Sequence, residues 1–240
     1  MDRWLNRRAE SLLRHTPDPL VVDLGFGASS ITTIQWRRAL ARLRTDIRVL
    51  GLEIDPNRVA AARNHEQPGL EFRRGGFELA GTRPVLVRAA NVLRQYDETD
   101  VPAAWHRMTS SLAPGGLLLE GTCDEIGRLA GWVLLDATGP RTLTLAADLT
   151  HLDRPAALAE RLPKALIHHN VPGRPIHTLL TALDDAWRDT MPYAVFGPRD
   201  HWRRTLDRLA NNGHPVIEPP SRRRDGTLTV PWHIVRPSRT

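Results

Sequence analysis

The sequence predicts an α/β protein with a mainly parallel sheet and helices on both of its faces. Short apolar segments of strand length alternate with helical patterns through residues 20–119, and this alternation is typical of such sheets. The longest apolar runs, 115–119 and 131–135, have the length of buried strands and are too short to span a membrane. The composition, with 41% hydrophobic and 25% charged residues in 240, is that of a globular chain with a sizeable core.

The first half of the chain shows the strand and helix pattern most clearly. Apolar spacing predicts a helix over 2–15 and a buried strand over 20–24, followed by a tight turn of small residues. Ser29 or Ser30 is expected to cap the next helix, which carries Trp36 and Leu40 on one face. The remaining elements are a strand at 48–54, a helix that Asp55 caps and Pro56 opens, strands at 71–73 and 84–87, a helix at 102–112 and a strand at 116–119.

The pattern changes after residue 122. Residues 131–136 and 142–147 flank the turn 137–140 and predict a β-hairpin, but the pattern leaves the edge topology of the sheet open. Helices are expected at 154–168, 176–188 and 199–211, and a last strand pair at 215–218 and 227–235. We therefore expect a core domain over residues 1–150 and a helical C-terminal extension over residues 151–240, packed on that core.

Charge and cysteine content limit the partners and the compartment. The net charge is +6, and all but one of the 33 basic residues are arginines, dispersed along the chain instead of gathered in one block. A positive field favours an anionic partner, yet this dispersion does not single out nucleic acid. The single cysteine, Cys123, excludes a disulfide framework and a cysteine-rich zinc site. The first residues lack the apolar run and cleavage site of a secretory signal, so we expect a cytoplasmic protein that does not bind membranes.

The strongest functional signal lies at the end of the first strand, in the segment D-L-G-F-G-A-S of residues 23–29. Two glycines let the backbone approach a ligand closely, and the following helix offers free N–H groups at its positive end. A dinucleotide-binding loop of the form G-x-G-x-x-G would place its third glycine at Ser30. Its strand would also not normally end in an acid such as Asp23, so this loop points to another ligand.

D-x-G-x-G followed by an acid at the end of the second strand resembles the class I S-adenosylmethionine (SAM) dependent methyltransferases. Residues 50–56, L-G-L-E-I-D-P, resemble the second-strand motif of that family. Residues 112–119, L-A-P-G-G-L-L-L, resemble its L-x-P-G-G-x-L-h segment before the fifth strand. Residues 89–93 occupy the loop after the fourth strand. The resemblance extends over residues 20–122, about half of the chain.

This resemblance implies a Rossmann-like methyltransferase sandwich with SAM as its cofactor. It assigns Glu53 to the ribose hydroxyls, which suits a carboxylate that can accept from both hydroxyls of a cis-diol. It places the other cofactor-binding positions at Asp23, Gly25, Gly27, Ile54, Gly76, Phe77 and Asn91. Two positions depart from the family pattern, because Ser29 stands where a glycine is frequent and Gly76 where an aspartate often binds the adenine amino group.

The acceptor and any catalytic base stay open. Methyl transfer from a sulfonium depends mostly on positioning and on desolvation of the nucleophile, so no general base is assigned. We expect the methyl acceptor to be a small molecule, and RNA is the alternative acceptor. The C-terminal extension is expected to form part of the acceptor pocket. Two other classes are weighed: a non-catalytic binding or scaffold protein with the same fold, and an NAD-linked oxidoreductase. The pattern is silent on oligomeric state.

Three further features have a structural and a functional interpretation. Cys123 follows a threonine, as in RNA cytosine methyltransferases, but a buried, inert cysteine is the favoured interpretation because the companion cysteine is absent. His168, His169 and His177 lie in one loop without a local acid, so no metal site is predicted. The segments 202–204 and 222–224 are arginine-rich and are expected to be solvated charge instead of phosphate contacts.

Overall fold

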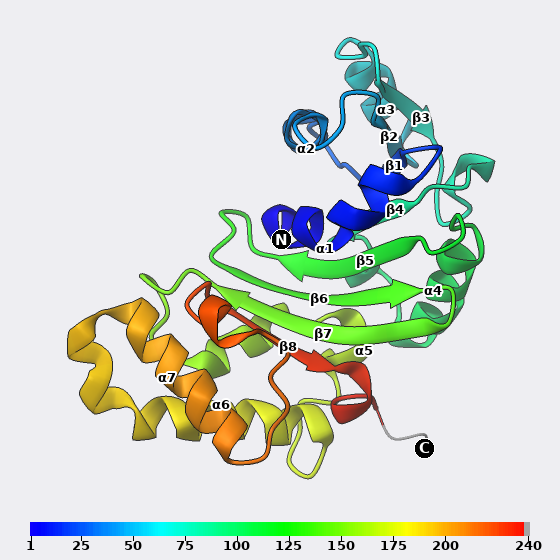
Figure 1. The fold of residues 1–240 in the computed structure, drawn as a ribbon. Coiled ribbons are helices and arrows are strands. Elements are labelled where there is room, and N and C mark those ends of the chain that lie inside the picture. The colour runs from blue at the N-terminus through cyan, green and yellow to red at the C-terminus, as the bar shows by residue number, and fades with distance from the viewer. Residues whose placement is uncertain (238–240) are drawn as a thin grey trace. The chain divides into compact units, whose positions relative to one another are not determined.

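A computed structural model describes residues 1–237, and it contains an eight-stranded sheet in the order β3-β2-β1-β4-β5-β6-β7-β8 (Figure 1). The β1–β2, β2–β3 and β1–β4 pairs are parallel, and the β7–β8 pair is antiparallel. The strands are β1 Leu20–Leu24, β2 Arg48–Glu53, β3 Leu70–Arg74, β4 Leu86–Ala90, β5 Leu117–Cys123, β6 Leu129–Asp136, β7 Gly139–Ala147 and β8 Thr227–Pro231. The predicted Rossmann-like α/β class is confirmed, including the antiparallel strands from the C-terminal half.

The chain divides into two compact units. Unit 1 contains Met1–Glu120 and Leu135–Gly139, and unit 2 contains Gly121–Leu134 and the chain from Pro140 onward. The main division thus falls at Glu120, whereas the sequence pattern placed a boundary near residue 150. The helices are α1 Asp2–His15, α2 Ile31–Ala41, α3 Pro56–Arg63 and α4 Val101–Ser110 in unit 1, and α5 Lys164–Ile167, α6 Pro175–Asp189 and α7 Pro198–Asn211 in unit 2. None of the helices within residues 1–237 combines the length and apolar character needed to cross a bilayer.

The helices of unit 1 follow from local patterns. In α1, Leu5, Ala9 and Leu13 form one fully buried stripe at the i, i+4, i+8 spacing of a helix face. In α3, the Asp55 carboxylate accepts hydrogen bonds from the N–H groups of Asn57 and Arg58, which confirms the predicted cap. At the N-terminus of α2, Ser30 stands at the cap position but its hydroxyl bonds the ring of His65, whereas the Ser29 hydroxyl accepts from the Ile31 N–H at 3.4 Å.

Helices cover both faces of the parallel part of the sheet. Thr33 of α2 bonds Asp23 of β1, so α2 lies on the face that also carries Arg88, the register partner of Asp23 in β4. The Leu117 N–H of β5 donates to the Val85 carbonyl before β4, and this register places Glu120 beside Ala89. Successive side chains of a strand point to opposite faces, so Glu120 lies on the face opposite to Arg88. There Trp105 of α4 bonds the Glu120 carboxylate. Two helices from different parts of the sequence therefore sandwich the sheet.

An aromatic pair fixes the backbone that follows β1. The rings of Phe26 and Phe72 meet edge to face with their centroids 5.1 Å apart. Gly51 lies opposite Phe72 in register, and a Cβ there would come within 2.5 Å of the Phe72 ring. The absence of a side chain at Gly51 therefore makes room for this pair, which stabilises the loop by about 1 kcal/mol beyond its buried area.

The predicted hairpin is present as β6 and β7, but the predicted strand at 215–218 is wrong. Only the Ile217 N–H joins the sheet edge, by donating to the Thr229 carbonyl of β8. Glu218 uses its carboxylate instead, accepting from the N–H and the hydroxyl of Thr229. This buried side chain satisfies the edge of β8 where a second strand was expected, and burial raises the pKa of Glu218.

Helices α6 and α7 lie side by side in unit 2 (Figure 1). Trp187 of α6 packs on His201 and Trp202 of α7, with centroid distances of 3.8 Å and 6.3 Å. The ring of His201 is buried, and its Nε2 lies 3.0 Å from the Trp187 carbonyl oxygen. Trp187 and Trp202 are therefore packing aromatics.

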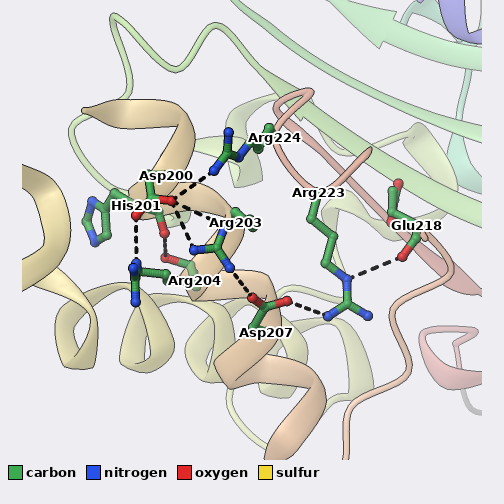
Figure 2. Close-up of polar contacts among 9 residues, drawn as sticks. Asp200, His201, Arg203, Arg204, Asp207, Glu218, Arg223 and Arg224 are labelled. Carbon is green, nitrogen blue, oxygen red and sulfur yellow. Dashed lines mark hydrogen bonds and ion pairs between the residues drawn. The ribbon is translucent and has the colours of Figure 1, made fainter. Parts of the chain in front are cut away.

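The two arginine-rich segments are held in an ion-pair network, which the sequence pattern did not predict (Figure 2). Asp200 of α7 pairs with Arg203, Arg204 and Arg224, and these contacts hold its pKa down at about 2, with the Arg204 hydrogen bond as the largest cause. Asp207 pairs with Arg203 and with Arg223. The network fastens the turn at 222–224 to α7.

Candidate active site

The parallel strands bring the predicted site residues to one edge of unit 1. Parallel pairing aligns Leu24 with Leu52 and Ala89, and Glu53 with Arg74, so the carboxyl ends of β1 to β4 lie side by side. Glu53 ends β2, and the loops that follow the strands carry the other predicted cofactor-binding residues of this edge, Gly25, Gly27, Ile54, Gly76, Phe77 and Asn91. In open α/β sheets this carboxyl edge is where ligands bind.

The glycine loop, residues 25–30, depends on its two glycines for different reasons. Both have a positive φ, +71° at Gly25 and +75° at Gly27, which is costly for other residues. A Cβ at Gly25 would lie 2.6 Å from Cγ2 of Val92, so this glycine permits close approach of the loop after β4. A Cβ at Gly27 would meet no atom within 4 Å. The backbone at Gly27 therefore borders open space at the edge where a ligand is expected.

Glu53 joins the end of β2 to the glycine loop. One carboxylate oxygen accepts from the Gly27 N–H at 3.0 Å, and the other accepts from the N–H groups of Ile54 and Asp55 at 2.8 and 3.2 Å. Arg58 lies 3.7 Å away, and Glu53 is only 5% exposed. A carboxylate has about four lone-pair directions, so three N–H bonds leave capacity for about one further donor. The arrangement fixes the Glu53 side chain and makes it a rigid acceptor.

The loops after β2 and β3 form an apolar surface with an acid beside it. Ile54 is 60% exposed, although an aliphatic side chain gains by burial. Phe77 contacts Tyr96 from the segment after β4, with ring centroids 5.1 Å apart. Gly76 lies between these features, since a Cβ there would come 3.8 Å from Ile54. An exposed aliphatic side chain next to an aromatic pair suits the faces of a planar, apolar ring.

Glu78 is a site residue that the sequence analysis missed. Its carboxylate accepts from the Gly76 N–H at 2.7 Å, and this bond is the main reason why the pKa of Glu78 lies below its usual value. The acid follows Gly76 by two positions, and that spacing was the available signal. The next two residues, Leu79 and Ala80, both have a positive φ near 50°, so the chain turns back in an unusual conformation here. The Glu78 carboxylate thus lies beside Gly76, the position at which this sequence lacks an acid.

Asp23 lies below the edge, in the interior of unit 1. It is 4% exposed, and its two oxygens accept from Thr33 and from both Nε and Nη2 of Arg88, at 2.6 to 2.9 Å. Burial disfavours the charged form of Arg88, but Asp23 and Asp2 more than offset this and raise its pKa. The sequence analysis missed Arg88, because the strand was expected to end at residue 87, whereas β4 extends to Ala90.

Asn91 begins the segment after β4 with a φ of +62°, a left-handed conformation that asparagine tolerates better than most residues. The backbone reversal brings Val92 against Gly25, so the loops after β4 and β1 touch. The predicted site residues at Gly25 and Asn91 are thereby placed at adjacent strands. Asp23 alone among the predicted residues lies away from this edge, inside the sheet.

The remaining polar candidates are of other kinds. No group of three metal-ligating side chains occurs within residues 1–237, the histidines at 168, 169 and 177 included. Cys123 is half-buried at the end of β5. Glu120, three residues earlier, is fully buried, and its Oε2 accepts from the indole N–H of Trp105 at 3.3 Å. Its Oε1 has no hydrogen-bond partner within residues 1–237. Burial raises the pKa of Glu120 to about 7.

No protein-family model and no curated protein matches the chain. Among solved structures, the CurJ carbon methyltransferase matches with a TM-score of 0.43 and 17% identity over 53% of this chain and 36% of that one. Magnesium protoporphyrin IX methyltransferase from Synechocystis PCC 6803 with bound SAM matches with a TM-score of 0.39 and 17% identity, over 52% and 59% of the two chains. A pericyclic reaction enzyme matches with 0.42 and 16%, over 50% and 31%. Each likeness spans about half of this chain and less than two thirds of the solved chain.

Proposed function

We propose that this chain is a SAM-dependent methyltransferase that acts on a small-molecule acceptor. The observation that carries the proposal is the contact between Glu53 and Gly27. It joins the acid at the end of β2 to the glycine loop after β1, and both belong to the motif that resembles the methyltransferase family. The open space beside Gly27 and the exposed side chain of Ile54 suit a nucleoside-containing cofactor at the same edge.

Different residues at the carboxyl edge of the sheet are assigned to different parts of the cofactor. Glu53 would accept from a ribose hydroxyl, for which its one remaining acceptor position and its fixed orientation are suited. Ile54 and Phe77 contact the adenine ring, and the Gly76 backbone lies at its edge. Glu78, held by the Gly76 N–H, is the acceptor for the adenine amino group in place of the aspartate that the family often has. The loops at Gly25 and Asn91 surround the methionine end.

When bound, SAM would supply a methyl group on a positively charged sulfur, for in-line attack by an acceptor nucleophile with S-adenosylhomocysteine as the leaving group. The protein residues contribute by orientation and by exclusion of water, which account for most of the catalysis of such a displacement. Asp23 lies inside the sheet next to the site and connects β1 to α2 and β4, by accepting hydrogen bonds from Thr33 and Arg88. We assign no general base, and RNA is the other acceptor class to be tested.

The first test is calorimetric titration of SAM and S-adenosylhomocysteine into the wild-type protein and into Glu53→Gln. We expect micromolar binding by the wild type and at least tenfold weaker binding by the variant. Glu71→Gln is the matched control, since Glu71 is an exposed acid in the neighbouring strand β3. Within residues 1–237 its carboxylate forms an ion pair only with Arg73. Absence of binding by cofactor-free wild-type protein would contradict the proposal.

A non-catalytic binding or scaffold protein with this fold is the second candidate. The observation in its favour is that Glu53 already accepts three N–H bonds, so that a ribose diol competes with the protein's own backbone. SAM carrying a labelled methyl group, incubated with extracts of small molecules and separately with RNA, distinguishes the two. Binding without transfer of label to any acceptor favours the scaffold.

A further inference from the structure

The guanidinium of Arg88 is engaged on three sides inside unit 1. Its Nε and Nη2 donate to the two oxygens of Asp23 at 2.9 and 2.6 Å, and its Nη1 donates to Asp2 of α1 at 2.7 Å. Its central carbon lies 4.2 Å from the centroid of the Trp36 ring of α2. A two-pronged bond of this kind fixes direction as well as distance, because the guanidinium and the carboxylate are both planar.

The Asp23–Arg88 pair lies immediately before two loops that touch. Asp23 and Arg88 are register partners in β1 and β4. Two residues after Asp23 is Gly25, whose α carbon faces Val92 so closely that a Cβ would not fit. The ion pair and the Gly25–Val92 contact are therefore two successive links between the same strands, one inside the sheet and one at its edge. We expect a change in the ion pair to shift the Gly25–Val92 contact, because packed residues between them have little freedom.

The same pair connects the edge to two helices. Thr33, in the first turn of α2, donates to Asp23, so Asp23 also sets where the helix behind the glycine loop begins. Asp2 in the first turn of α1 ties that helix to Arg88. Asn6 of α1 accepts from the indole N–H of Trp36, which closes the connection between α1 and α2. Arg88 is the shared partner of β1, α1 and, through Trp36, α2.

We propose that Arg88 is a positioning residue of the cofactor site: through Asp23 it holds the glycine loop in its binding arrangement. The expected effect on cofactor affinity rests on the proposed function. The effect on the arrangement of the glycine loop does not depend on it. Arg88 touches none of the edge residues to which the cofactor is assigned. It acts through Asp23, and it explains why an acid precedes the glycines although the carboxylate is buried.

The test compares Arg88→Met with Arg48→Met. Arg48 is the matched control, because it begins the neighbouring strand β2 at the opposite edge and pairs with Asp18 at the surface. Hydrogen exchange of the ligand-free proteins reports on the loop, since the Gly25 N–H donates to Leu52 and the Gly27 N–H to Glu53. We expect at least tenfold faster exchange of these two amides in Arg88→Met, and rates within twofold of the wild type in Arg48→Met.

Cofactor titration supplies the second readout, in a double-variant cycle with Asp23→Asn. Arg88→Met is expected to weaken SAM binding at least tenfold in the wild-type background and less than threefold when Asp23 is already Asn, because the two residues act as one unit. Arg88→Lys keeps the charge but loses the two-pronged bond, and an intermediate affinity is expected. If Arg88→Met does not fold, Arg88→Lys and Asp2→Asn replace it, since both leave Asp23 a cationic partner.

The outcomes separate the two proposals. Folded Arg88→Met protein with wild-type exchange at Gly25 and Gly27 overturns the role of Arg88, and so do fully additive effects in the cycle. If the wild type binds neither SAM nor S-adenosylhomocysteine, the proposed function fails, and the exchange rates still decide whether Arg88 positions the loop.

Discussion

The carboxylate of Glu53 accepts a hydrogen bond from the backbone N–H of Gly27, 26 residues earlier in the chain, at 3.0 Å. The bond unites the two halves of the motif that the sequence analysis identified. It also explains how a nearly buried acid keeps its place at a strand end, because bonds from backbone N–H groups compensate the loss of water. The geometry of the edge thus depends on backbone contacts as much as on side chains.

Gly25→Ala is expected to destabilise the protein and to abolish cofactor binding. The new Cβ meets Val92 at 2.6 Å, and the positive φ adds strain, so we expect a loss of about 2–4 kcal/mol in the free energy of unfolding. Gly27→Ala is the control, with a similar φ but open space, and about 1 kcal/mol is expected there. Denaturant unfolding measures both. Adding Val92→Ala to Gly25→Ala restores part of the loss, and no recovery would contradict the steric explanation.

Ile54→Ser is expected to weaken SAM binding about fivefold without loss of stability. The Ile54 side chain is mostly exposed in the protein alone, so the substitution removes little that folding buries. A bound adenine covers it, and the lost apolar contact corresponds to about 1 kcal/mol. Ile126→Ser provides the comparison, since Ile126 is also mostly exposed but lies in the turn between β5 and β6. Calorimetric titration with equal affinities for the two variants would remove Ile54 from the site.

Glu120 is expected to make stability depend on pH between about 4.5 and 7. Burial raises its folded pKa to about 7 from the usual 4.5, so the folded form retains the proton while the unfolded form loses it. Its contribution is therefore fully present below pH 4.5 and is lost as pH rises through 7, by about 3 kcal/mol in all. Urea unfolding across this range measures the slope.

Glu120→Gln removes the titration, so the difference in unfolding free energy between variant and wild type should change across this range and level off above pH 7. A difference for Glu120→Gln that does not change with pH would show that the side chain is ionised or solvated in the folded protein.

The helices, strands and turns that depend on residues close to one another in the sequence were predictable from local patterns. The bounds of α1 and β1 agree with the spacing of apolar residues, and the Asp55 cap and the β6–β7 hairpin follow from short local patterns. Side chains at fixed spacing share a face whatever the rest of the chain does. The predicted edge residues came together for a related reason, since parallel strands place their carboxyl ends side by side.

The sequence by itself determined the α/β class, the glycine loop and the acid at the end of β2, because each depends on a local pattern. Only the tertiary structure decided which partner each polar group has. Arg88 meets Asp23 across 65 positions, and the Glu78 carboxylate turns back to the Gly76 N–H just before a left-handed turn in the chain. Pairing of this kind depends on strand order and on the exact end of β4, which no local spacing encodes. For Arg88, burial then makes the partner obligatory, because a charged group without one is costly inside a protein.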